Sequence, residues 1–164
     1  TSSVNRFPIL QISWIVFGLT ILGCDTAERQ ADFFAEANRP PAGIVETDVD
    51  GKIIQEDLDD WRTAPAFEQD LFVDPAYPNP VLLNADVVIP LTVNRSLRTG
   101  VWVRYRSSDG TLRVLDTLEE ARSPGLYFVN FNASQLGSDG LHRVYFFDGF
   151  GELISYGDIE VRRR

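Results

Sequence analysis

The chain has 164 residues, 44% of them hydrophobic, which is enough for one packed domain and an anchor but too few for two full-sized domains. Its formal net charge is −9, from 15 Lys and Arg against 24 Asp and Glu, and the only basic cluster is three C-terminal arginines, so nucleic acid is excluded as a partner. With one cysteine and one histidine, the chain lacks the residues for an intramolecular disulfide and for the common zinc, iron–sulfur and covalent haem sites.

The first predicted element is an uncharged apolar block at residues 7–23, preceded by Arg6 and followed by Asp25 and Glu28. This order of charges favours a cytoplasmic N-terminus, with the remainder on the periplasmic or another extracytoplasmic side. As a helix the block would extend roughly 25 Å, slightly less than the ~30 Å hydrocarbon core of a bilayer. Residues 1–24 are therefore predicted to be a membrane anchor or a lipoprotein signal.

The apolar block ends in Ile21-Leu22-Gly23-Cys24, which resembles the lipobox of bacterial lipoproteins. The resemblance implies cleavage before Cys24 and lipidation of that cysteine. The alternative is a retained single span that contains an unmodified Cys24, and a core helix is a third interpretation. The first two interpretations both attach the protein to a membrane.

Residues 25–70 are predicted to be an acidic linker. Residues 25–74 carry 14 acidic and 4 basic side chains, whereas residues 75–164 carry 10 of each. Helix-forming residues follow Asp25 until Pro40-Pro41, so we expect a short helix that continues from the anchor, or a flexible tether. Four aromatic residues of this segment are candidate partner contacts, although the last two could instead cap the core of the following domain: Phe33, Phe34, Trp61 and Phe67.

Within this segment, residues 46–57 have two interpretations. The favoured one is a β-hairpin that turns at Asp50-Gly51, with apolar residues on both sides of the turn. The alternative is a loop that resembles the calcium sites of EF-hand and dockerin proteins, with oxygen ligands at alternate positions around Gly51. That loop would use Glu46, Asp48, Asp50 and Asp57 as ligands, and calcium is the only cofactor considered.

From residue 71 onward, short runs of β-branched and aromatic residues alternate with turn residues, which is typical of a β-sandwich. The chain is therefore predicted to be mainly β, with an Ig-like antiparallel β-sandwich of about seven strands at residues 71–164. The predicted strands are residues 71–74, 86–93, 101–106, 111–115, 125–131, 141–148 and 152–161.

Alternation within these strands predicts which side chains point into the core. The inward face of strand 125–131 is either Leu126 with Phe128 or the alternate set that contains Val129. Arg104 and Arg106 fall on the outward side of their strand. Pro90 predicts that strand 86–93 lies at a sheet edge or contains a bulge.

The hexapeptide Pro75-Ala76-Tyr77-Pro78-Asn79-Pro80 contains a Tyr-Pro-Asn-Pro motif. It resembles the start of the Ig-like domain found in flagellar hook-capping proteins and in the C-terminal sorting domains of type IX secretion cargo. The resemblance covers residues 71–164 and implies the Ig-like fold. The sorting function is not carried over, because a hydrophobic anchor conflicts with delivery as soluble cargo.

No combination of nucleophile and base, paired carboxylates or phosphate-binding loop stands out, so the chain is predicted not to be an enzyme. The preferred function is a membrane-anchored accessory subunit that docks on other subunits of a larger bacterial membrane complex. Its architecture is similar to small anchored subunits of respiratory assemblies such as alternative complex III. The alternative is a free-standing envelope lipoprotein that binds a protein or carbohydrate through loops such as 94–100 and 132–140.

Overall fold

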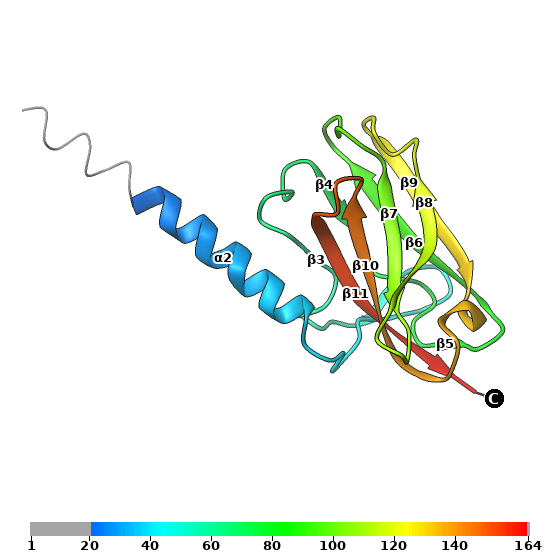
Figure 1. The fold of residues 1–164 in the computed structure, drawn as a ribbon. Coiled ribbons are helices and arrows are strands. Elements are labelled where there is room, and N and C mark those ends of the chain that lie inside the picture. Colours follow the sequence, from blue (N-terminus) through cyan, green and yellow to red (C-terminus); the bar gives the residue numbers. More distant parts are fainter. Residues whose placement is uncertain (1–20, 164) are drawn as a thin grey trace, which may run out of the picture.

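The computed structural model describes the backbone of residues 21–163 and the side chains of residues 25–163. Within this part the chain is mainly β, with a single α-helix (Figure 1). In chain order the elements are α2 (Ile21–Ala37), β1 (Glu46–Thr47), β2 (Ile53–Gln55), β3 (Arg62–Thr63), β4 (Leu71–Val73), β5 (Val81–Leu82), β6 (Asp86–Val93), β7 (Val101–Arg106), β8 (Leu112–Leu118), β9 (Gly125–Asn132), the 3-10 helix η2 (Ala133–Leu136), β10 (Gly140–Asp148) and β11 (Leu153–Arg162).

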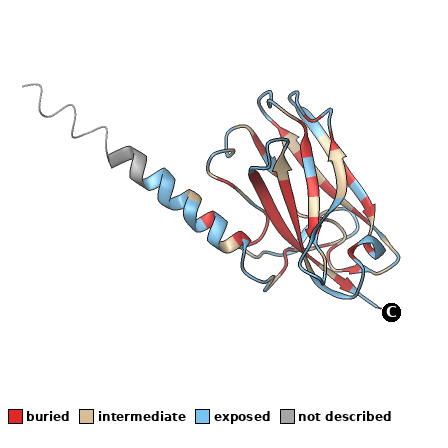
Figure 2. Cartoon of the chain, viewed as in Figure 1, coloured by how far each residue is buried: buried red, intermediate tan, exposed pale blue. Residues whose placement is uncertain are grey.

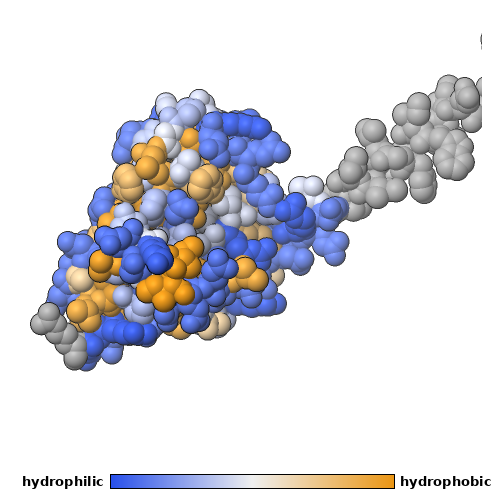
Figure 3. Space-filling view, turned by 180° about the vertical axis from the view of Figure 1, so that it is seen from behind, coloured by the Kyte–Doolittle hydropathy of each residue, from blue (hydrophilic) through white to orange (hydrophobic). Residues whose placement is uncertain are grey.

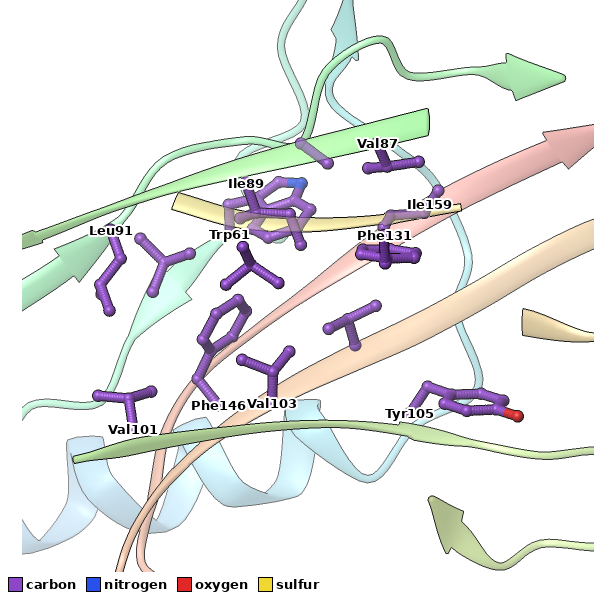
Figure 4. Close-up of a cluster of buried hydrophobic side chains, with 14 of the residues drawn as sticks. Trp61, Val87, Ile89, Leu91, Val101, Val103, Tyr105, Phe131, Phe146 and Ile159 are labelled. Atoms are coloured by element: carbon purple, nitrogen blue, oxygen red, sulfur yellow. The ribbon is translucent and has the colours of Figure 1, made fainter. Parts of the chain in front are cut away.

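Two sheets pack face to face. The larger has the order β3-β11-β10-β7-β8, with β5 paired in parallel to the end of β11, and the smaller has the order β4-β6-β9. Figure 4 shows the core between them, where Ile89 of β6 faces Val103 of β7 and Phe146 of β10, all fully buried. The prediction of a mainly β chain built from antiparallel sheets is confirmed.

All seven strands predicted for residues 71–164 are present, and those at 86–93 and 101–106 have the predicted bounds. The largest difference is in β8, which continues to Leu118. In β9 the structure selects one of the two predicted faces, since Val129 points into the core while Leu126 and Phe128 are exposed.

The two strands β10 and β11 depart from simple alternation, because they are buried on both faces. Nearly every residue of β11 is buried (Figure 2). One face of these strands contacts the smaller sheet, and the other is covered by the C-terminal part of α2 and by Ala64 and Phe67. The predicted linker segment thus contributes a third layer over the larger sheet.

Helix α2 contacts the sandwich through one face of its last turns. Phe33 and Ala37 are buried, Gln30 is half-buried and Phe34 is partly exposed, which is the i, i+3, i+4, i+7 spacing of an amphipathic helix. The residues from Asp25 to Arg29 are exposed, and the helix projects away from the sandwich (Figure 1). Helix α2 ends before Pro40-Pro41, as predicted.

The prediction for Pro90 is wrong. Strand β6 lies in the middle of the smaller sheet, between β4 and β9, and is paired along its whole length with β9. The proline is tolerated because its carbonyl points toward β4, where it accepts from the Asp74 N–H at 3.0 Å, and the β4 ladder ends at Val73. The absent N–H of Pro90 therefore faces a position where β4 no longer pairs.

The asparagine of the Tyr-Pro-Asn-Pro motif, Asn79, links three segments of the chain through hydrogen bonds of its side chain. Asn79 is fully buried; its side-chain amide donates to the carbonyls of Val45 and Asp158 at 3.1 and 2.9 Å, and its oxygen accepts from the Glu160 N–H at 3.0 Å. The peptide bonds before Pro78 and Pro80 are cis. A buried side chain with its polar groups satisfied in this way ties the segment before β5 to β11 and to the residues before β1.

Trp61 packs closely against Gly157 of β11. Its backbone is in the left-handed region with a φ of 53°, and its indole lies so close to Gly157 that a Cβ at position 157 would be 2.2 Å from the ring. We expect Gly157→Ala to lower the free energy of unfolding by about 2 kcal/mol, because the indole must move within a packed core.

Chemical denaturation would measure this loss. Gly125→Ala is the matched control, because its added Cβ would meet Tyr127 at an ordinary 3.4 Å. Equal stabilities of the two variants would contradict the close approach of Trp61 and Gly157.

None of the described helices is long and apolar enough to cross a membrane. The anchor predicted at residues 1–24 falls mainly outside the described residues.

Candidate functional site

The four predicted calcium ligands do not converge. Within residues 25–163, no group of three or more His, Cys, Asp or Glu side chains is placed to hold a metal ion. Asp48 Oδ1 instead accepts from the N–H groups of Asp50 and Lys52 at 3.0 and 2.9 Å, and Asp57 Oδ1 accepts from the Asp59 N–H at 3.2 Å. Glu46 belongs to β1.

Residues 46–55 form the predicted hairpin, in which β1 pairs with β2, and Asp57 lies after it. The turn is centred on Val49-Asp50 instead of Asp50-Gly51, since the Gly51 N–H donates to the Asp48 carbonyl and Gly51 has a φ of 83°. The loops at 107–111 and 148–152 are closed by the same two backbone hydrogen bonds and also have a glycine at their fourth position.

The four aromatic candidates for partner contact occupy different environments. Phe33 is fully buried between α2 and β11, with its ring centroid 5.4 Å from that of Tyr156. Trp61 lies in the sandwich core. Phe34, 39% exposed, and the partly buried Phe67 border an open groove on the surface. The side chain of the predicted lipidation site, Cys24, lies outside the described residues.

A groove of about 640 Å³ runs between α2 and the outer face of the larger sheet. We call it the α2 groove. Gln30 and Phe34 line it from α2, Tyr145 and Phe147 from β10, and Arg106 from β7. Phe67, Leu112 and Leu153 add further apolar surface, so the groove is mostly hydrophobic, with Arg106 and Glu152 as its charged lining residues.

Exposed apolar residues occur on the smaller sheet as well, at Phe72, Leu126 and Phe128. Figure 3 views the molecule from the side opposite to Figure 1 and shows hydrophobic side chains gathered in patches among hydrophilic ones. Apolar surface alone therefore does not distinguish one face of this molecule. The α2 groove differs in having an arginine, Arg106, beside one of its aromatic rings, Tyr145.

The helix is fixed to the sheet by a buried arginine that the sequence patterns did not single out. Arg143 of β10 forms a bidentate ion pair with Asp158 of β11, with both N–O distances 2.7 Å. Its remaining nitrogen, Nη1, donates to the carbonyls of Glu36, Ala37 and Arg39 at 2.8–3.2 Å. These carbonyls lie at the C-terminal end of α2, where backbone acceptors lack partners within the helix and a cation is favoured.

Asp60 extends this buried network. Its carboxylate accepts from the N–H groups of Val45, Trp61 and Asp158 at 3.0, 3.0 and 2.7 Å. Burial nevertheless raises the pKa of the Asp60 carboxyl from 3.8 to about 7, and the nearby charge of Asp158 acts in the same direction. The network therefore joins the residues before β1, the residues before β3 and strand β11.

This pKa predicts a pH dependence of stability. The folded state binds the Asp60 proton more tightly than the unfolded state does, so stability is lost as the pH rises from about 4 through 7. We expect Asp60 to account for a loss of about 2 kcal/mol between about pH 5 and pH 7 in urea denaturation. Asp60→Asn would be less stable overall, but its stability would depend less steeply on pH. Identical slopes for both proteins would contradict this assignment.

The two loops named for ligand binding lie at opposite ends of the sandwich. Loop 94–100 leads into Val101, which pairs with Asp148 at the end of β10, whereas loop 132–140 leads into Gly140 at the start of β10. A strand of nine residues places these ends about 26 Å apart. Loop 94–100 instead contacts the β10–β11 turn, where Thr99 Oγ1 accepts from the Gly149 N–H at 2.8 Å.

Comparisons with known proteins add little. No family model matches the chain, and no curated protein matches its sequence. Among solved structures it is similar to a Niemann-Pick type C2 protein from Japanese carpenter ant, at 10% identity, over 58% of this chain and 89% of that chain, with a TM-score of 0.34. A similarity this weak carries no inference about function.

Proposed function

We propose that the protein is a non-catalytic accessory subunit that is tethered to a membrane through residues 1–24 and docks its β-sandwich on a larger membrane complex. The observation that supports this most is the attachment of α2 to the sandwich. Phe33 is fully buried against Tyr156, and Arg143 binds three carbonyls at the end of the helix. A tether that passes through such a helix gives the sandwich a fixed direction relative to its attachment point.

The tether itself is proposed to be either a lipid on Cys24 or a retained apolar span. The lipobox-like Ile21-Leu22-Gly23-Cys24 supports the first, and the apolar block at residues 7–23 supports both. Intact-mass spectrometry distinguishes the two, since an acylated species that begins at Cys24 excludes a retained span. Recovery of the full-length chain from the aqueous fraction of lysed cells would contradict both.

We also propose an Ig-like identity for the sandwich, on the Tyr-Pro-Asn-Pro motif and the strand pattern of residues 71–164. A bacterial respiratory assembly such as alternative complex III is the first kind of complex to test. The periplasmic or other extracytoplasmic side follows from Arg6 before the apolar block and the acidic residues after it.

Co-purification tests the docking function. A tagged copy is extracted from native membranes in a mild detergent and separated by size. We expect it to leave the membrane with a partner in fixed stoichiometry. Recovery as a monomer would exclude the subunit role and favour the alternative of a free-standing envelope lipoprotein.

A further inference from the structure

The outer face of the larger sheet carries a cluster of arginine and aromatic side chains beside the α2 groove. In the β7–β10 register Arg104 pairs with Tyr145 and Trp102 pairs with Phe147, and Arg106 follows two residues after Arg104 on the same face of β7. The Arg104 Cζ lies 5.4 Å from the ring centroids of Trp102 and Phe147, and the Arg106 Cζ lies 5.7 Å from that of Tyr145. We call these five residues the arginine–aromatic face.

The charges of the arginine–aromatic face are not neutralised within the part of the chain that the structure describes. None of the ion pairs found there involves Arg104 or Arg106. Arg104 Nε is buried and has no hydrogen-bond partner. Arg106 makes one long hydrogen bond, to the Gly110 carbonyl at 3.4 Å. Other described arginines, such as Arg62 and Arg98, also lack acidic partners, but Arg104 and Arg106 lie side by side on one strand face, and the buried, unpartnered Nε of Arg104 needs an acceptor, which an external anion would supply.

The arginine–aromatic face and the α2 groove form one surface, because Arg106, Tyr145 and Phe147 belong to both. A ligand there would place an apolar body against Phe34 and Phe147 and an anionic group against the two guanidinium groups. Arginine favours this arrangement, since its planar fork binds carboxylates in a bidentate manner and it stacks on aromatic rings. Arginine and aromatic residues are also the types most enriched at the energetic centres of protein interfaces.

We propose that this surface binds a segment of a partner polypeptide in which carboxylate side chains flank apolar ones. The proposal deepens the docking function and rests on it. Charge complementarity favours a polypeptide over a membrane as the partner. A polypeptide can place its carboxylates opposite Arg104 and Arg106 and nowhere else on this surface. An anionic bilayer laid over this surface would also meet Glu152, which lines the groove, and would be repelled by it.

A binding measurement on the purified full-length protein tests this proposal. The probes are three short fluorescein-labelled peptides that share their leucines and carry glutamate, glutamine or lysine at the remaining positions. Fluorescence anisotropy in a nonionic detergent, with a blank of detergent alone, gives their affinities. We expect the glutamate peptide to bind at least about tenfold more tightly than the other two, and to weaken as salt is added.

The variant Arg104→Gln with Arg106→Gln should abolish the preference for the glutamate peptide. Arg113→Gln is the control for a single arginine substitution, because it removes one positive charge from neighbouring β8, where Arg113 is already paired with Asp109 at 3.1 Å. An unchanged melting temperature shows that the double variant is folded. If the double variant does not fold, the single variant Arg106→Gln replaces it, because Arg106 is exposed. This single substitution should reduce the preference for the glutamate peptide severalfold.

Three results would overturn the proposal. The first is equal affinity for the glutamate and glutamine peptides. The second is an equal effect of Arg113→Gln and the double variant. The third is an Arg104- and Arg106-dependent gain in vesicle association when phosphatidylglycerol is added to phosphatidylcholine, without any peptide preference, which would assign the face to lipid.

The co-purification experiment tests the docking function separately from this surface. If the native protein leaves the membrane as a monomer, the docking function is contradicted whatever the peptide affinities are. If it leaves with a partner that the double variant retains as firmly as the native chain does, the function stands and the assignment of this surface fails.

Discussion

Replacing Arg143 with methionine is expected to lower the free energy of unfolding by about 3–5 kcal/mol, the usual loss when one partner of a buried ion pair is removed. Methionine keeps much of the apolar stem but leaves the Asp158 carboxyl without its bidentate partner, and both side chains are almost fully buried. It also removes the side-chain donor to the carbonyls of Ala37 and Arg39, and one of the two donors to the Glu36 carbonyl, which still accepts from the Arg39 N–H. Urea denaturation followed by tryptophan fluorescence measures the loss.

Arg113→Met is the control for the Arg143 substitution. Its partner Asp109 and Arg113 itself are both more than half exposed, and exposed pairs contribute little, so we expect a loss below about 1 kcal/mol. The double variant Arg143→Met with Asp158→Asn should lose less free energy of unfolding than the sum of the losses of the two single variants, because neither member of the pair is then left without its partner. A loss for Arg143→Met no greater than that for Arg113→Met would show that the ion pair does not form in solution.

Truncating Phe33 to alanine is expected to cost about 3 kcal/mol or more, because the ring is fully buried and its removal leaves a cavity against Tyr156. The lost contacts are those between α2 and the sheet, so part of the effect should appear as release of the helix while the sandwich stays folded. Amide hydrogen exchange measured by mass spectrometry would resolve this: peptides from α2 should exchange faster, and those from β6 and β9 should change less.

Phe34→Ala provides a control one residue away. This ring is 39% exposed at the border of the α2 groove, so we expect a loss of less than about 1 kcal/mol and little change in exchange. Under the proposed docking function Phe34→Ala should instead weaken association with the partner. If the two alanine variants were equally stable, the position of α2 on the sandwich would be wrong.

The strands of residues 71–164 were predictable because their signals are local. Alternation and turn residues set seven strands, and the outward direction of Arg104 followed from the same pattern. The position of Pro90 was mispredicted because the rule concerns a missing N–H, and whether that N–H is needed depends on where β4 ends. Sheet order likewise depends on pairings such as Ser155 with Thr63, far apart in the chain, which no local pattern contains.

The candidate site was predicted only in part. Phe33 and Phe34 were grouped together, although their positions relative to Gln30 and Ala37 on a helix would have indicated a shared face toward the sheet. Arg143 and Asp158 were missed because strands 141–148 and 152–161 were expected to bury one face. The four consecutive apolar residues 144–147 are typical of a strand buried on both faces, and that signal could have directed attention to Arg143 directly before them.

Strand β11 follows every other described element in the chain, yet it joins β3, β5 and β10 and supplies Gly157 beneath Trp61. During synthesis, α2 and the segment that holds Trp61 consequently lack their packing partners on β11 until residues 153–162 have emerged. Folding must wait for the last part of the sandwich to leave the ribosome or translocon, and the early aromatic residues stay exposed to chaperones until then.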